Sequence, residues 1–176
     1  MPRLRTLPPD SSMLDVYRLD LEIARPLLRL QQQLLRGPSP FTPGERELIA
    51  AYVSGLNACG FCVGVHRAVA TGLGVEPAAL EALVAHGPSP ERHGRLAPVL
   101  DFVRKLTLAP SRMTDADAEA VRAAGWDETA LFHATLVCAL FSFFNRLADG
   151  LGLDPERIDV RRVAQGLVSI GYEGRL

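Results

Sequence analysis

Apolar side chains recur every three or four residues along almost the whole chain, which is the pattern of amphipathic α-helices. No stretch of four or more residues alternates cleanly between apolar and polar positions, as a half-buried strand would. The sequence therefore predicts an all-α fold, a single-domain helical bundle of about seven to eight helices over residues 1–176.

Capping signals mark where several of these helices begin. Thr42 precedes Pro43 and has Glu45 three residues later, which predicts a capping box. Thr114 and Asp127 are further N-cap candidates. The first apolar pattern predicts one long helix, or two short ones separated near Pro26. We expect helices at about residues 14–35, 43–56, 58–72, 77–85, 96–108, 114–125 and 127–148, and one short helix in the tail.

One weak internal repeat follows two of these helices. The octapeptide at 70–77, ATGLGVEP, returns at 148–155 as ADGLGLDP. Either a shared type of glycine-rich helix end or two related helical units could produce this likeness. With the same offset, the reactive side chains of the first unit align with apolar ones in the second, which is then expected to be scaffold.

Composition and charge exclude several classes of partner. The chain has 19 lysines and arginines against 20 acidic residues, so no overall basic field draws it to nucleic acid or to an anionic membrane. The N-terminus lacks the apolar core of a secretory signal, and no apolar run reaches the roughly 18 residues of a membrane span. We expect a cytoplasmic protein, where paired cysteines are more often catalytic or metal-binding than permanently bridged.

Two of the three cysteines lie close to one of the four histidines. The stretch at 56–68, LNACGFCVGVHRA, contains Cys59, Cys62 and His66. A helix that begins near Asn57 turns about 100° per residue and places all three side chains on one face, toward the core. In the first turn of a helix, free N–H groups and the helix dipole favour a thiolate. His66 lies one turn after Cys62 and can exchange a proton with its sulfur.

The preceding helix offers a carboxylate for this histidine. From Leu48 to Leu56 its only hydrogen-bonding side chains are those of Tyr52 and Ser54, so the segment is expected to be buried nearly all round. Glu47 opens this segment and has no role in a cap, and a buried carboxylate needs a partner. A hydrogen bond from the His66 ring to the Glu47 carboxylate would orient the ring and raise its basicity, as in a catalytic triad.

The stretch at 45–68, ERELIAAYVSGLNACGFCVGVHRA, resembles the signature of the alkylhydroperoxidase D-like, carboxymuconolactone decarboxylase superfamily. Glu47, Cys59, Cys62 and His66 match its glutamate, CxxC motif and histidine position for position. The segments VLDFVRKLT (99–107) and FSFFNRLADGLGL (141–153) resemble its peroxidase-related branch. The resemblance implies an alkylhydroperoxidase D-like core at residues 41–176, with residues 1–40 as an N-terminal helical arm.

This resemblance implies a thiol peroxidase that uses neither a cofactor nor a metal ion. Cys62 would attack a small, organic hydroperoxide and become a sulfenic acid, which Cys59 would resolve to a disulfide. An external dithiol reductant would reduce that disulfide, and Glu47 and His66 would relay the protons. The subunits would form a homo-oligomer, as a dimer, trimer or hexamer.

One position departs from the family pattern. The alkylhydroperoxidase D pattern has a second histidine between the cysteines, where this chain has Phe61. Proton delivery would then depend on His66 alone or on water. The alternative function is therefore a non-peroxidatic redox-sensing or disulfide-reductase protein that keeps the fold and the dithiol. Lactone decarboxylation fits less well, because that branch of the superfamily is poor in cysteine.

Other uses of the motif fit these residues less well. A zinc site at the two cysteines and His66 has no obvious fourth ligand, and a structural disulfide is disfavoured in a reducing compartment. A c-type haem is excluded, because Val63 follows the second cysteine in place of a histidine.

The remaining notable side chains have structural explanations. Cys138 and His133 are expected in the core, Tyr52 in packing, and Trp126 as a plug at a helix junction. Asn145 and Arg146 are expected to pair with acids at a helix end or across a subunit contact.

Overall fold

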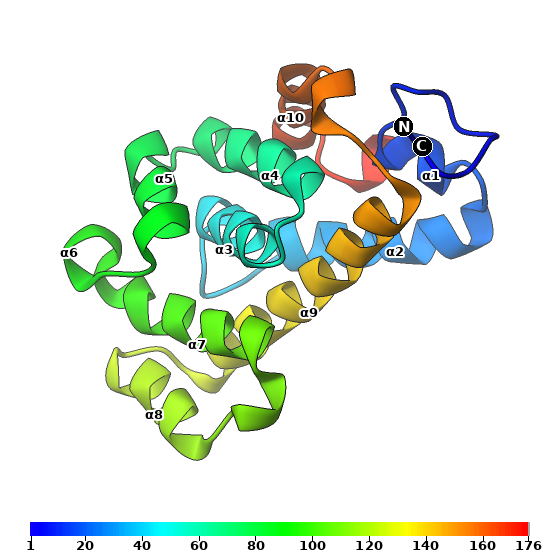
Figure 1. Ribbon diagram of the computed structural model, residues 1–176. Helices are drawn as coiled ribbons and strands as arrows, with labels where there is room; N and C mark the ends of the chain where they lie inside the picture. The colour runs from blue at the N-terminus through cyan, green and yellow to red at the C-terminus, as the bar shows by residue number, and fades with distance from the viewer. Residues whose placement is uncertain (176) are drawn as a thin grey trace.

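The computed structural model describes residues 1–175, and within that range the protein is all-α, with no strand, as expected (Figure 1). Its α-helices are α1 (Met13–Tyr17), α2 (Leu21–Arg36), α3 (Pro43–Leu56), α4 (Gly60–Gly72), α5 (Pro77–His86), α6 (Pro90–His93), α7 (Ala97–Leu108), α8 (Asp115–Ala123), α9 (Glu128–Leu151) and α10 (Val160–Ser169). Short 3₁₀ turns are η1 (Gly94–Leu96), η2 (Pro110–Arg112), η3 (Pro155–Arg157) and η4 (Glu173–Arg175).

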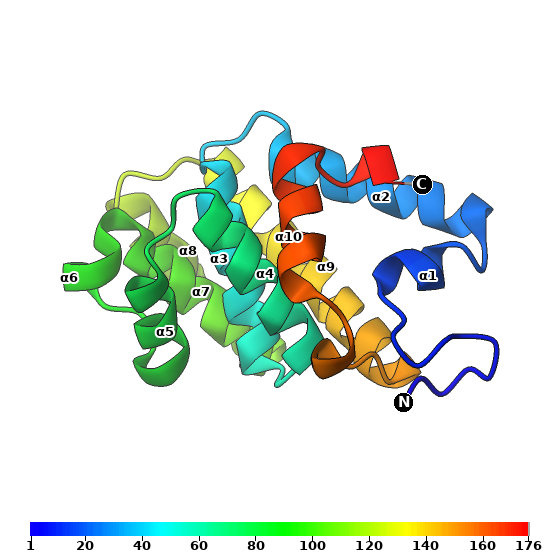
Figure 2. The same cartoon turned by 90° about the horizontal axis from the view of Figure 1, so that it is seen from above.

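Helix α3 lies at the centre of the fold. It packs along α4 and also contacts α9, α7, α5 and α2, so that other helices surround it (Figures 1 and 2). Every residue from Arg46 to Ser54 is buried, which confirms that this segment is enclosed on all sides. A polar side chain carried by this stretch therefore has to find its partners inside the protein.

The predicted N-caps are confirmed. The backbone N–H of Glu45 donates to Thr42 Oγ1 at 3.2 Å, and the Glu45 carboxylate accepts from the backbone N–H of Thr42 at 2.7 Å. Thr114 forms the same reciprocal box with Asp117, and Asp127 accepts from the backbone N–H of Ala130. These local bonds set the starts of α3, α8 and α9.

The expected separation near Pro26 is wrong. The break lies earlier, after Tyr17, and Asp20 caps α2 by accepting from two backbone N–H groups. Pro26 lies within α2 on its exposed side, where its missing N–H removes one helical hydrogen bond. The opposite face of α2 buries Ala24, Leu28 and Leu35, and this packing keeps the helix continuous through the proline.

Both octapeptides of the internal repeat form the same helix end. Gly74 and Gly152 have left-handed φ values of 92° and 71°. In each copy the backbone N–H of the residue after this glycine donates to the carbonyl five residues earlier. Val75 donates to Ala70 and Leu153 to Ala148, both at 3.0 Å. This is a Schellman cap, so capping alone explains the shared glycine.

Helix α9 is, within residues 1–175, the one helix long and apolar enough to cross a membrane by length and composition. Core helices pass the same test, and α9 packs against α3, α4 and α7. Its inner face buries Val137 and Phe141, whereas Phe132 and Phe143 are exposed on its other side.

The N-terminal and C-terminal segments meet at α2. Both α1 and η4 contact α2 (Figures 1 and 2). The division of the chain into an arm and a core at residue 40 stays a prediction.

The corner between α3 and α4 fixes where the CxxC motif begins. Ala58 has a left-handed φ of 56°, and the backbone N–H groups of Ala58 and Cys59 donate to Gly55 and Ser54, each at 3.0 Å. This is again a Schellman cap, here with alanine where glycine is usual. Cys59 therefore has two roles: its N–H takes part in the C-terminal cap of α3, and the residue is the N-cap of α4.

We predict that Ala58→Gly stabilises the protein, because an exposed L-residue in the left-handed region is strained and glycine is not. The free energy of unfolding in urea should rise by about 0.5–1 kcal/mol. The matched control is Ala120→Gly in the exposed interior of α8, which should lower it by about 1 kcal/mol. A loss of stability in Ala58→Gly would show that this corner is unstrained.

Candidate active site

Helix α4 places the two thiols and the histidine on one side. Cys59 is its N-cap residue, Cys62 lies in its first turn and His66 in the next. All three cysteines are free thiols and buried; Cys59 is 0% and Cys62 3% exposed. Of the two motif thiols, Cys62 lines an internal cavity and Cys59 does not.

The two thiols influence each other's ionisation. Hydrogen bonding from Cys62 lowers the pKa of Cys59 against the opposing effect of burial. The same interaction, together with burial, raises the pKa of Cys62. When Cys59 ionises, the proton that remains on Cys62 stabilises its negative charge. Ionisation of Cys62 as well is strongly opposed, because it would place two negative charges side by side.

Asn145 reaches this pair from α9. Its Nδ2 donates to Ser54 Oγ and its Oδ1 accepts from Asn57 Nδ2, both at 2.9 Å, and its amide also lowers the pKa of Cys62. The expectation that Asn145 pairs with an acid is wrong, because it is buried beside the thiols. Arg146 is exposed and donates to the Ser142 carbonyl of its own helix, and its pairing with an acid across a subunit contact stays a prediction.

Glu47 is the centre of a buried polar network. Its Oε2 lies 2.6 Å from His66 Nδ1, and its Oε1 lies 2.7 Å from Arg36 Nη1. The hydroxyl of Tyr172, from the segment after α10, donates to the same Oε1 at 2.8 Å. The predicted contact between Glu47 and His66 is present, whereas Arg36 and Tyr172 were not foreseen.

The partners of Glu47 keep it ionised. Burial acts to raise the pKa of this fully enclosed carboxyl, but the charge and hydrogen bond of His66, with Arg36 and Tyr172, outweigh burial and lower it. Burial and the adjacent Glu47 charge raise the pKa of Tyr172 well above its usual range, so Tyr172 remains a donor. His66 is also fixed by Phe141, whose ring meets the imidazole edge-on at 4.5 Å between centroids.

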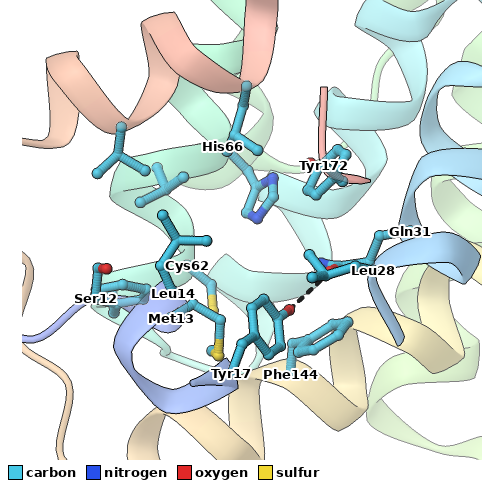
Figure 3. A pocket seen from close by; sticks show the side chains of 14 residues that line it. Ser12, Met13, Leu14, Tyr17, Leu28, Gln31, Cys62, His66, Phe144 and Tyr172 are labelled. Carbon is cyan, nitrogen blue, oxygen red and sulfur yellow. Dashed lines mark hydrogen bonds between the residues drawn. The ribbon is translucent and has the colours of Figure 1, made fainter. Parts of the chain in front are cut away.

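A cavity of about 60 Å³ opens beside Cys62 and His66. Its walls come from α1, α2, α4, α9, α10 and the segment after α10, and Figure 3 shows His66, Cys62, Tyr17 and Gln31 around one space. Most of the lining is apolar, and it includes Phe61 at the position of the second family histidine. The space suits a few waters or one small molecule.

Other candidate residues lie apart from this site. Cys138 is buried with its sulfur 3.2 Å from Thr107 Oγ1, and half-buried His133 hydrogen-bonds Ser39 Oγ. The Tyr52 hydroxyl is buried without a partner and does not line the cavity. Trp126 packs on Phe41, as a plug would. No group of three or more His, Cys, Asp or Glu residues within 1–175 is arranged to hold a metal ion.

Part of the chain matches a family of known proteins. Residues 22–97, which include Glu47 and the CxxC motif, match the carboxymuconolactone decarboxylase family. The fold is similar to that of an uncharacterised peroxidase-related protein from a Silicibacter species, with a TM-score of 0.74 and 26% identity over 92% of this chain and 78% of that one. Together these two matches support the resemblance to the alkylhydroperoxidase D-like, carboxymuconolactone decarboxylase superfamily.

Two further solved structures share the fold at lower identity. An uncharacterised peroxidase-related protein from Ralstonia eutropha, described as an alkylhydroperoxidase D core, has a TM-score of 0.76 and 24% identity over 86% of this chain and 78% of that one. An Agrobacterium tumefaciens protein of unknown function, provisionally assigned to antioxidant defence, has a TM-score of 0.67 and 18% identity over 88% of this chain and 97% of that one. No curated protein matches the sequence.

We predict that Glu47→Gln removes part of the acid sensitivity of this protein. A carboxyl whose pKa is lowered by folding stabilises the fold above its ordinary pKa of 4.5, and this stabilisation is lost as the pH falls through the folded value. The free energy of unfolding of the wild type should therefore fall more steeply below pH 4.5 than that of Glu47→Gln.

The comparison uses urea unfolding at several pH values, and slopes rather than absolute stabilities decide it. The control is Glu76→Gln at the exposed start of α5, whose profile should follow the wild type. Parallel wild-type and Glu47→Gln profiles would contradict an ionised Glu47.

Proposed function

We propose that the protein is a thiol peroxidase that reduces small hydroperoxides through a dithiol–disulfide cycle at Cys59 and Cys62. One observation carries the proposal: Cys62 and His66 line the same small cavity, and His66 is held on its far side by the buried carboxylate of Glu47. A nucleophile, a base and a group that orients the base are the parts that such chemistry needs.

The reaction has two chemical steps before recycling. The Cys62 thiolate attacks the terminal oxygen of ROOH; the S–O bond forms, the O–O bond breaks, and the leaving oxygen takes a proton to become ROH. Cys62 is then a sulfenic acid. Cys59 attacks its sulfur, which forms the disulfide and releases water, with the sulfenic oxygen leaving as the water oxygen.

His66 is proposed to move the proton in the first step. Its Nδ1 is occupied by Glu47, which leaves Nε2 as the nitrogen for exchange with Cys62. The pKa of Cys62 is raised in the resting pair, so its proton has to be accepted as the peroxide binds. A base beside Cys62 meets that requirement, and the protonated ring can then donate to the leaving oxygen.

Recycling is proposed to need an external dithiol. Both sulfurs are buried, and residues of α1, Met13 and Leu14, form part of the cavity wall beside Cys62. Cytoplasmic location, and assembly as a dimer, trimer or hexamer, stay predictions.

Phe61 favours a second candidate function. It lines the cavity where the family pattern has a histidine, so this wall offers no second proton donor. A protein with the same dithiol but slow turnover would act as a redox sensor or disulfide reductase. The same experiment separates the two functions, because they differ in the rate of the first step.

We predict that reduced protein loses two thiols per chain within seconds of mixing with hydrogen peroxide or ethyl hydroperoxide. Stopped-flow fluorescence would follow the reaction, and mass spectrometry should find a Cys59–Cys62 disulfide. Cys62→Ser should abolish peroxide consumption, and Cys59→Ser should accumulate a sulfenic acid at Cys62 that a dimedone probe traps.

Cys138→Ser is the control, since that buried thiol lies outside the site, and it should react like the wild type. Equal effects of Cys62→Ser and Cys138→Ser would contradict the assigned roles. Thiols that stay reduced for many minutes would favour the sensor or disulfide-reductase function.

A further inference from the structure

The wall of the cavity opposite the α4 motif carries a buried amide. Gln31, on α2, is 5% exposed and lines the cavity together with Tyr17 of α1, which is equally buried. Neither residue belongs to the CxxC motif or to the Glu47 network. The remaining lining from α2 and α9 is apolar, through Leu28 and Phe144.

Tyr17 fixes which end of the amide is available. The Tyr17 hydroxyl donates to Gln31 Oε1 at 2.7 Å, so Nε2 is the free end of the side chain. No residue within 1–175 accepts a hydrogen bond from Nε2. This atom is not fully buried, and its residue lines the cavity. Figure 3 shows the Tyr17–Gln31 bond at the edge of the space that His66 also faces.

An amide donor in an apolar cavity costs free energy unless an acceptor fills the site. Water can supply that acceptor in the resting protein. A small oxygen-containing ligand would supply it during function, and the volume of about 60 Å³ admits only a few heavy atoms beside Cys62.

We propose that Gln31 is a catalytic residue that donates a hydrogen bond from Nε2 to the leaving oxygen of the peroxide, with Tyr17 as its positioning residue. This inference rests on the proposed peroxidase function. As the Cys62 sulfur bonds to the terminal oxygen, the O–O electron pair moves to the leaving oxygen, and sulfur is oxidised while the peroxide is reduced. Nε2 stabilises that developing charge, and His66 supplies the proton.

The test compares two reactions of Cys62 in Gln31→Met, which keeps the size of the side chain and removes the donor. The rate constant for oxidation by ethyl hydroperoxide should fall about ten- to hundredfold. The rate constant for alkylation by iodoacetamide should change less than twofold, because its leaving group is iodide and no charge develops on oxygen.

Gln33→Met, at an exposed glutamine of the same helix, is the matched control and should react like the wild type. Tyr17→Phe, which keeps the ring and removes the bond that orients the amide, should lower the peroxide rate several-fold and leave alkylation unchanged. If Gln31→Met does not fold, the Tyr17→Phe variant tests the role of Gln31 in its place.

An unchanged peroxide rate in the folded Gln31→Met protein, or equal falls in both reactions, would overturn the role of Gln31. A wild type that alkylates but does not react with peroxide would instead overturn the proposed function, and this inference with it.

Discussion

The burial of one negative charge organises this protein. Glu47 lies on the central helix with 0% exposure, where an ionised carboxyl without partners would be prohibitively costly. Three side chains meet that cost: Arg36 from α2, His66 from α4 and Tyr172 from the segment after α10. The carboxylate thus ties three separate segments to α3, and the orientation of His66 follows from the same bonds.

This arrangement gives the two ring nitrogens of His66 different surroundings. Nδ1 faces the network of fixed charge, and Phe141 closes one edge of the ring. The cavity lies on the side of Cys62, between the motif on α4 and the Tyr17–Gln31 pair on α1 and α2. The N-terminal helices therefore form part of the cavity wall as well as covering it.

Features set by neighbouring residues could be predicted from the sequence. Thr42 with Glu45, Thr114 and Asp127 cap helices through bonds that span three residues, and the spacing of Cys59, Cys62 and His66 fixed their common face. Arg36, Tyr172, Gln31 and Asn145 could not be assigned, because their partners are distant in the chain and arginine, tyrosine and amide side chains have many ordinary uses. The predicted helix break at Pro26 is wrong because packing of the opposite face of α2 outweighs the cost of a proline inside the helix.

The bond between Tyr172 and Glu47 joins residues 125 positions apart, and it has a consequence for synthesis on the ribosome. Chains fold as they emerge, beginning from the N-terminal side. The α3–α4 pair and its thiols leave the ribosome long before residue 172, so Glu47 lacks one of its donors through most of translation. We expect His66 to acquire its final orientation only after the segment that carries Tyr172 has docked onto α3.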